Sequence, residues 1–298
     1  MNRQLVAQRH DPYPSRHVQQ PSITPRLDPV VYGEDDGPLD PELVQSYEDD
    51  GFLVVPNLLS PSEAFEVDAE IERLALDPDV RARPQSVLEP DSDALRSLFE
   101  VHVGDGPLAA LARDERLAGA ARQLLGSDVY VHQSRVNLKP GFRGEVFDWH
   151  SDFETWHTED GMPRMRALSC SVLLTPNHGN NGPLLAIAGS HQWFVACVGE
   201  TPDRHFEQSL RRQEVGVPDE RSLRALAEGG RIEACMGAPG TVVFFDCNLM
   251  HGSNSNITPD PRRNVFIVYN SVENALEEPF AAPAPRPEHI ASRTFTPL

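Results

Sequence analysis

Two histidines and an aspartate have the types and spacing that a catalytic metal site requires. His150 and Asp152 stand two residues apart in Trp149-His150-Ser151-Asp152. In an extended chain such residues point to the same side. His251 follows a predicted strand, Thr241–Phe245, in the turn-like run Met250-His251-Gly252-Ser253-Asn254. Two imidazoles and one carboxylate form the facial triad of non-haem Fe(II) oxygenases, which leaves other coordination positions open. We therefore predict an Fe(II) site at these three residues.

A cation downstream of His251 extends the pattern. Arg262 lies eleven residues beyond this histidine, a spacing typical of oxygenases that use 2-oxoglutarate and O2 as co-substrates. The metal in such enzymes binds the 2-oxo acid end, and the far carboxylate needs a cation at fixed reach. The planar guanidinium fork suits a carboxylate because it can bind both oxygens. Ser253 could add a hydroxyl donor. The alternative, that Arg262 and Arg263 form a solvated surface pair, stays open at this stage.

A polar stripe is predicted on the strand Asp128–Lys139. Alternation with a period of two places Gln133, Arg135, Asn137 and Lys139 on one side. Lys139 is the only lysine among 26 basic residues, which suggests a compact point charge facing the cofactor, where arginine would be too bulky. The stripe alone does not separate substrate contacts from co-substrate contacts. For Trp156, hydrophobic packing is the default role, and most of the eleven histidines are expected to be structural.

Longer motifs carry a resemblance to a known family. The stretch FDWHSDFETWHTEDGMPRMRALS from Phe147 is similar to the signature of the ectoine hydroxylases, which belong to the phytanoyl-CoA dioxygenase superfamily. Two more stretches, CVGETPDRHFEQSLRRQEVGVPD and FFDCNLMHGSNSNITPDPRRNVFIVYNSVENALEEPF, resemble it as well. The likeness covers roughly residues 39 to 293 and departs at Ala188, where proline is usual before Gly-Ser-His. It implies a jelly-roll core, a homodimer and the conversion of ectoine to 5-hydroxyectoine, an osmotic-stress solute.

The resemblance also assigns roles to individual residues. It places the iron on His150, Asp152 and His251. It assigns 2-oxoglutarate contacts to Arg262, Ser253 and Lys139, and the strand stripe adds Asn137 to them. It assigns ectoine contacts to Gln133, Trp156, Thr155 and Ser171. Ectoine is a small zwitterion with a carboxylate and a delocalised amidinium. The amidinium would suit an aromatic wall, because a desolvated cation is attracted to the face of an indole ring.

The strands and helices expected around these residues indicate a mainly β fold. Further strands are expected at Arg166–Thr175, Leu184–Ala188, Thr241–Phe245 and Asn264–Ser271. Short strands without alternating helices favour a double-stranded β-helix, the jelly-roll or cupin-like class, supported by N-terminal helices. Those helices are predicted from Pro41 to Gly51, behind the capping box Ser60–Glu63, and from Pro107 to Leu125. The second is expected to bury one face, formed by Ala64, Phe65, Val67, Ile71, Leu74 and Ala75. The first of them leads into a short strand, Phe52–Val55, and Asp203 to Gly229 is expected to be a helical insertion.

Composition excludes several classes of protein. A net charge of −19 argues against nucleic-acid binding and against docking on anionic membranes. The first twenty residues lack the apolar core of a secretory signal. Four cysteines without a CxxC pair indicate reduced thiols in a cytoplasmic protein. Residues 1–38 are polar and proline-rich and are predicted to form a flexible arm, with a single domain over 39–298.

Three alternatives remain open from the sequence. The chain could be a related 2-oxoglutarate oxygenase that acts on another small zwitterion. It could be a non-catalytic jelly-roll module that holds a structural metal, although an open-sided triad together with Arg262 counts against this. A zinc hydrolase is the third alternative, but the chain has no HExxH motif.

Overall fold

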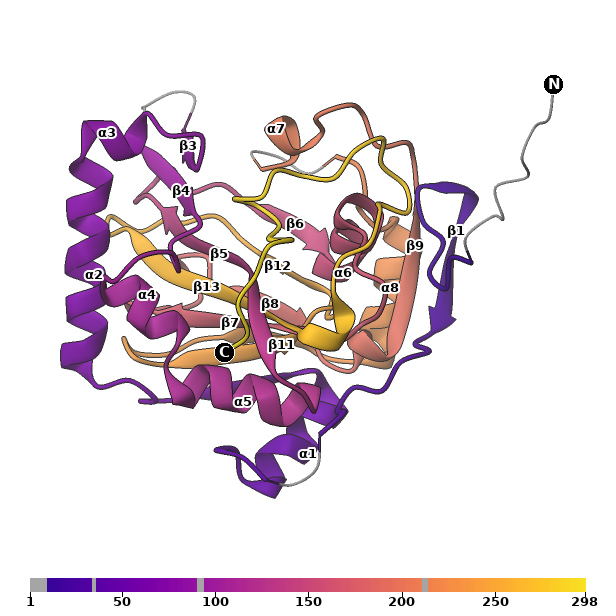
Figure 1. Ribbon diagram of the computed structural model, residues 1–298, viewed down its shortest axis with the longest axis horizontal. Helices are drawn as coiled ribbons and strands as arrows, with labels where there is room; N and C mark the ends of the chain where they lie inside the picture. The colour runs from indigo at the N-terminus through magenta and orange to yellow at the C-terminus, as the bar shows by residue number, and fades with distance from the viewer. Residues whose placement is uncertain (1–9, 34–35, 90–93, 211–213) are drawn as a thin grey trace.

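Two antiparallel sheets form the centre of the molecule (Figure 1). The computed structural model describes residues 10–33, 36–89, 94–210 and 214–298. The larger sheet has the strand order β2-β11-β7-β13-β5-β4-β3, and the smaller has the order β10-β8-β12-β6. Strands β1 and β9 form a separate pair. Every pairing between these strands is antiparallel. This arrangement confirms the predicted fold class.

The strands and helices have the following bounds. The strands are β1 His17–Pro25, β2 Phe52–Val55, β3 Ser86–Leu88, β4 Leu95–Phe99, β5 Val129–Lys139, β6 Phe147–His150, β7 Ala167–Leu173, β8 Leu184–Ile187, β9 Trp193–Val198, β10 Ile232–Cys235, β11 Val242–Asp246, β12 His251–Ser253 and β13 Arg262–Ser271. The α-helices are α1 Pro41–Asp50, α2 Pro61–Leu76, α3 Pro78–Arg81, α4 Pro107–Ala112, α5 Glu115–Leu125, α6 Asp152–Thr155, α7 Phe206–Ser209 and α8 Glu220–Gly229. A π-helix, η1, covers Trp156–Asp160, and short 3-10 turns cover η2 Ser190–Gln192 and η3 Val272–Asn274.

Apolar side chains pack on both faces of the larger sheet. Its outer face packs against α2, α4 and α5 in one core that includes Ile71, Leu117, Val136 and Ile267. Its inner face meets the smaller sheet through a second core that includes Leu173, Ala186 and Phe245. The space between the sheets also holds polar side chains from β5, β7 and β13. Those strands therefore present an apolar face to the helices and a mixed face to the interior.

The N-terminal helices are confirmed, with two corrections. Ser60 accepts a hydrogen bond from the backbone of Glu63, and the Glu63 carboxylate accepts one from the backbone of Ser60, which completes the predicted capping box. Phe65, expected on the buried face of α2, is 71% exposed, because the buried positions are Ala64, Val67 and Ile71. The helix predicted from Pro107 to Leu125 is two helices, since the Asp114 side chain caps a new N-terminus at α5.

The alternation along β5 holds only as far as a β-bulge. Gln133 pairs with Val268 and Val131 with Tyr269, so one extra residue, His132, lies between them. A bulge reverses which face successive side chains occupy. Val131 therefore packs in the outer core, while His132 contacts Trp156 on the inner side. The stripe from Gln133 to Lys139 is unaffected, because it lies on one side of the bulge.

The segment predicted as an arm contributes a strand. Residues 17–25 form β1, which pairs with β9 beside the sheets (Figure 1). Tyr13 and Arg16 are each only 1% exposed. Sequence periodicity does not reveal this packing, because single buried anchors separated by polar residues hold the segment in place. Residues 1–9 and 34–35 of the predicted arm lie outside the described residues.

In the predicted insertion the structure has α7 and α8, and residues 211–213 lie outside the described part. The four cysteines are free and buried, and burial raises the pKa of each thiol. No helix in the described ranges has the length and apolarity that crossing a membrane requires.

Candidate active site

The predicted metal ligands converge at the edge of the smaller sheet. His150 ends β6, Asp152 begins α6 and His251 begins β12. His150 and His251 are direct partners in the pairing of β6 with β12. The Asp152 carboxylate lies 3.7 Å from Nε2 of His150 and 3.9 Å from Nε2 of His251. The three donor atoms all lie within 4.8 Å of one another, so these residues could hold a metal ion.

Hydrogen bonds and electrostatics prepare this donor set for a cation. Nδ1 of His150 contacts the carbonyl of Asp148 at 2.7 Å, and Nδ1 of His251 contacts that of Leu249 at 2.9 Å. A proton on Nδ1 leaves Nε2 free as a ligand, the usual outer contact of a metal-bound histidine. Burial, followed by the charge of His150, lowers the pKa of His251 to about 4. Burial alone would raise the pKa of Asp152, but His251, His150 and Arg135 lower it overall. The donor set therefore matches a facial triad in its ligand form.

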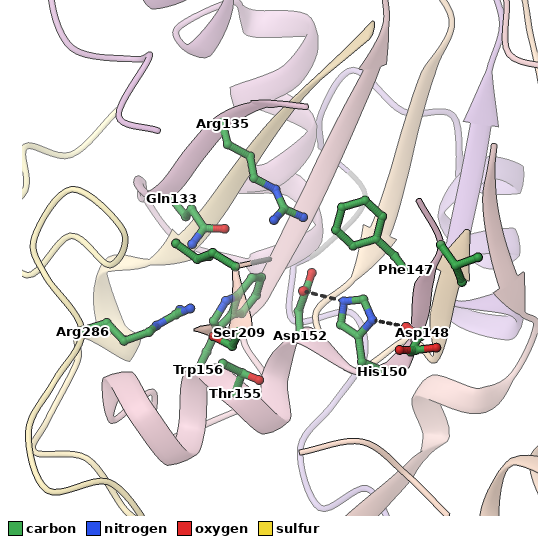
Figure 2. A pocket seen from close by; sticks show the side chains of 12 residues that line it. Gln133, Arg135, Phe147, Asp148, His150, Asp152, Thr155, Trp156, Ser209 and Arg286 are labelled. Atoms are coloured by element: carbon green, nitrogen blue, oxygen red, sulfur yellow. Dashed lines mark hydrogen bonds and ion pairs between the residues drawn. The ribbon is translucent and has the colours of Figure 1, made fainter. Parts of the chain in front are cut away.

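Two cavities meet at this triad. The first extends from His150 and Asp152 towards the π-helix, and Figure 2 shows Gln133, Arg135, Asp152 and Trp156 around a common space. The second extends from His150 and His251 between β5, β12 and β13. Three residues, Arg135, Phe147 and His150, line both cavities. Two small molecules bound in these cavities would therefore both lie next to the metal ligands.

The first cavity contains three of the four predicted ectoine contacts. Gln133, Trp156 and Thr155 line it (Figure 2). The Gln133 amide donates to the carbonyl of Ile290 at 2.8 Å. The Trp156 ring is 2% exposed and packs edge-to-face against His132, with the ring centroids 5.2 Å apart. Ser171, the fourth, lines neither cavity; its hydroxyl accepts a hydrogen bond from Asn264 at 3.2 Å.

The second cavity contains most of the predicted 2-oxoglutarate contacts. Arg262, Asn137 and Ser253 line it. Nη2 of Arg262 donates to the amide oxygen of Asn137 at 2.5 Å, while its buried Nε has no partner. Burial, followed by the charge of Arg135, lowers the pKa of Arg262 to about 10, which leaves it cationic at neutral pH. A buried guanidinium without a carboxylate partner is costly, and an anionic ligand would offset that cost.

Lys139 lies behind the wall of the second cavity. It is directly opposite Arg262 in the pairing of β5 with β13 and is 1% exposed. Nζ donates to the Ser253 hydroxyl at 2.8 Å and to the carbonyl of Asn254 at 2.5 Å. Burial, followed by the charges of Arg262 and Arg96, lowers the pKa of this ammonium to about 6. In the described residues neither Lys139 nor Arg262 forms an ion pair with a carboxylate, so Arg262 is a cation without a counter-charge, and an anionic ligand would favour the protonated form of Lys139.

Sequence reasoning missed several residues of the first cavity. Arg135 points into it (Figure 2), is half-buried, and has a buried Nε without a partner. Its place on the predicted stripe was a sufficient signal, because it shares a face with Gln133 and Asn137. Arg286 and Ser209 also line the cavity. They come from irregular or short helical segments, and neither belongs to a local pattern that would place it there.

Comparison with a family model identifies the class of protein. Residues 47–264 match the model for phytanoyl-CoA dioxygenase (PhyH). This range includes both histidines and the aspartate of the triad. The chain belongs to the phytanoyl-CoA dioxygenase family.

Comparison with individual proteins gives close relatives within that class. The chain is 58% identical to the ectoine dioxygenase of Bordetella bronchiseptica over 97% of its own length and 94% of the relative's. It is 55% identical to the ectoine dioxygenase of Stutzerimonas stutzeri over 97% and 96%. The crystal structure of EctD from S. alaskensis with 2-oxoglutarate and 5-hydroxyectoine matches with a TM-score of 0.86 and 49% identity over 95% of each chain. The same enzyme with bound Fe gives a TM-score of 0.84. The chain is thus similar to ectoine dioxygenases along nearly its whole length.

Proposed function

We propose that this chain is an Fe(II)- and 2-oxoglutarate-dependent dioxygenase that hydroxylates ectoine to 5-hydroxyectoine. One observation carries the proposal: a two-histidine, one-carboxylate triad faces two joined cavities of different chemistry. One cavity has buried cations without a carboxylate partner, as a dicarboxylate requires. The other combines Trp156, Gln133 and Arg135, which suit a small zwitterion. The relatives named above support ectoine as that zwitterion.

The proposed roles of the triad follow from its donors. His150, Asp152 and His251 would hold Fe(II), which, with 2-oxoglutarate and O2, supplies the oxidation that replaces a C5–H bond of ectoine by C–OH while succinate and CO2 are released. The backbone carbonyls of Asp148 and Leu249 hold both imidazoles with Nε2 directed inward. Asp152 offsets part of the charge of the ion. The protein therefore contributes a fixed set of ligands, and the cofactor contributes the oxidising chemistry.

The second cavity would bind and orient 2-oxoglutarate. Arg262 would bind the far carboxylate, with Asn137 fixing the plane of its guanidinium. Ser253 would add a hydroxyl donor, and Lys139 would add positive charge from behind that hydroxyl. A bidentate guanidinium contact fixes both the position and the direction of a carboxylate. These residues would therefore set which end of the molecule reaches the iron.

The first cavity would bind ectoine and exclude water. Arg135 lines both cavities and its charge acts on Asp152, so we assign it the carboxylate, which is attached next to C5. Trp156 would cover the amidinium, and Gln133 and Thr155 would offer hydrogen bonds at its edges. Ser171, which lines neither cavity, would act through Asn264. Placing the reacting C–H bond beside the iron is the main contribution of these residues to the rate.

Product analysis tests the proposal directly. Purified protein with Fe(II), 2-oxoglutarate, O2 and ectoine should form 5-hydroxyectoine with an equal amount of succinate, measured by chromatography. Omission of ectoine and chelation of the iron are the two controls, and each should abolish the product. Proline and other small zwitterions, assayed in parallel, should be poor substrates. Absence of hydroxyectoine, or faster turnover of another solute, would contradict the assignment.

Several further features belong to the same proposal. We propose a homodimer, because the family resemblance implies one. We also propose that the enzyme belongs to osmotic-stress metabolism. A cytoplasmic location is supported by the four free, buried thiols. We also propose that residues 39–298 form a single domain, to which β1 adds a packed strand. Light scattering should give about twice the chain mass of 33.0 kDa. Fractionation of the source cells should recover the protein with cytoplasmic markers.

A further inference from the structure

The wall of the first cavity rests on a buried cation from the N-terminal segment. Apart from residues of β5, β6 and the position just before β6, the lining comes from α6 and the π-helix, from residues 209 and 210, and from the C-terminal segment that carries Arg286; these segments form the substrate wall. Among the described residues of the N-terminal segment, none from 10 to 25 lines the cavity. Arg16 nevertheless lies beneath this wall and is only 1% exposed. It is among the largest fully buried side chains in the described ranges.

The guanidinium of Arg16 is fully engaged. Nε and Nη2 donate to the two carboxylate oxygens of Glu154, at 3.0 and 2.8 Å. Nη1 donates to the carboxylate of Glu159 at 2.5 Å and to the hydroxyl of Thr201 at 3.0 Å. Nη2 also reaches the hydroxyl of Thr155 at 3.4 Å. Lysine could supply this charge but not a planar fork with several donors.

Each partner of Arg16 either belongs to the cavity wall or is joined to it by the chain or by hydrogen bonds. Thr155 lines the cavity itself, and Trp156 lies between Glu154 and Glu159 in the chain. Glu159 also contacts Nδ1 of His205 at 2.8 Å, and the carbonyl of His205 accepts a hydrogen bond from the backbone of Ser209, a wall residue. The Thr201 hydroxyl donates to the carbonyl of Ala281 in the C-terminal segment. One side chain therefore connects three segments of the wall.

The backbone of Arg16 is itself held in an uncommon conformation. Its φ is +64°, a left-handed value that few residues other than glycine adopt. Its N–H donates to the carbonyl of Cys197 at 2.7 Å, and its carbonyl accepts from Gly199 at 3.0 Å. Burial would raise the pKa of Glu159, but His205 and Arg16 lower it overall, which keeps this carboxylate ionised. Such conformations persist where the surroundings determine them, and they concentrate at functional sites.

We propose that Arg16 is a positioning residue for the substrate. It fixes Thr155 and Trp156 relative to the segments that carry Ser209 and Arg286, without touching substrate, co-substrate or iron. The inference rests on the proposed function, because it names the substrate of the same cavity. It predicts that loss of the guanidinium fork weakens ectoine binding and leaves the second cavity intact.

Steady-state kinetics of three variants test this inference. Arg16→Gln removes the charge, Arg16→Lys keeps the charge without the fork, and Arg116→Gln removes a comparable set of ion pairs, to Glu63 and Asp114, away from the cavity. For Arg16→Gln we expect the half-saturation constant for ectoine to rise at least about 10-fold, because small misplacements are amplified at the reacting centre. The constant for 2-oxoglutarate should stay within about twofold, and succinate should exceed hydroxyectoine. Arg16→Lys should recover part of the loss, and Arg116→Gln should leave both constants unchanged.

The outcomes separate the two proposals. If the unmodified protein forms no hydroxyectoine, the proposed function falls, and this inference falls with it. If the unmodified protein is active and Arg16→Gln keeps an unchanged constant for ectoine, the positioning role alone is refuted. Equal loss of affinity for ectoine and 2-oxoglutarate would also refute it. Should Arg16→Gln not fold, Thr201→Val removes one of its contacts and should give a smaller change in the same direction; no change would overturn the inference.

Discussion

The two sides of the active site are built in different ways. The metal ligands lie on or next to β6 and β12, neighbouring strands whose main-chain hydrogen bonds set the ligand spacing. The substrate wall consists of α6, a π-helix and irregular segments, joined by side-chain ion pairs around Arg16, Glu159 and Asp160. Backbone pairing tolerates most substitutions, whereas a buried ion network fails when one member is removed. The metal side should therefore resist mutation outside its ligands, and the substrate side should depend on residues that never contact the substrate.

The largest effect should come from removing a ligand on the metal side. His150→Ala deletes one of three donors, and loss of a metal-site contact outside the ligands already costs about 10–100-fold. We expect more than about 100-fold loss of turnover, together with loss of bound iron measured by elemental analysis. His178→Ala, an exposed histidine, serves as the control and should keep both. Full activity of His150→Ala would disprove the triad.

Lys139 should make co-substrate binding depend on pH. With a pKa near 6 in the free protein, Lys139 is largely neutral at pH 8, and a bound dicarboxylate favours its charged form. The half-saturation constant for 2-oxoglutarate should therefore rise between pH 6 and pH 9, by up to about tenfold per unit. Lys139→Met should have a higher constant at pH 6 and a much flatter profile. An identical slope in the variant would remove Lys139 from the co-substrate site.

The same residue should influence stability with a defined sign. Between about pH 6 and 10.5 the unfolded chain binds a proton at Lys139 that the folded, ligand-free protein does not. Unfolding then takes up protons, so the contribution of this group to stability rises with pH across the window. At pH 7, Lys139→Met should raise the melting temperature, by about 1–2 °C for each 1 kcal/mol of burial cost removed in a chain of this size. A lower melting temperature, measured by calorimetry without 2-oxoglutarate, would contradict the burial argument.

On the substrate side, Trp156 provides a test of intermediate size. Trp156→Leu keeps an apolar side chain but removes the aromatic face, whose attraction for a desolvated cation is about 2 kcal/mol, or roughly 30-fold in affinity. The half-saturation constant for ectoine should therefore rise by roughly 30-fold. The half-saturation constant for 2-oxoglutarate should not change. Trp193→Leu, at a tryptophan that is 45% exposed, provides the control. Equal effects from both tryptophans would argue against a specific amidinium contact.

The smallest effect should arise in a region that serves neither side of the site. Ser60→Ala removes half of the capping box of α2 and should cost about 1 kcal/mol of stability. Thermal unfolding should show a decrease of about 1–2 °C in the melting temperature. Kinetic constants at 25 °C should not change, because α2 packs on the outer face of the larger sheet. A change in either constant would show that the outer helices communicate with the active site.

The two sides also differ in how far the sequence predicts them. The His150–Asp152 pair and the stripe from Gln133 to Lys139 follow from short-range periodicity, whereas His251 and Arg262 follow from their motif, which is similar to that of a known family. The pairing of Arg262 opposite Lys139 agrees with both predictions. Arg286 and Arg16 escape prediction because each finds its partner more than a hundred residues away in the chain. No local pattern encodes such a contact. The bulge at His132 was missed for a similar reason, since it depends on the partner strand and not on the composition of β5.

Because His150 and His251 are direct partners in the β6–β12 pairing, a bound metal should also stabilise the fold. These two residues lie about one hundred positions apart in the chain, so an ion bound to both closes a long loop. A reversible closure of this kind stabilises the folded state by mass action, by about 2.7 kcal/mol when the free ion is at 100 times its dissociation constant. The bound ion would act as a reversible cross-link between β6 and β12. The temperature of unfolding, followed against added divalent ion, would then report how much of the enzyme is loaded.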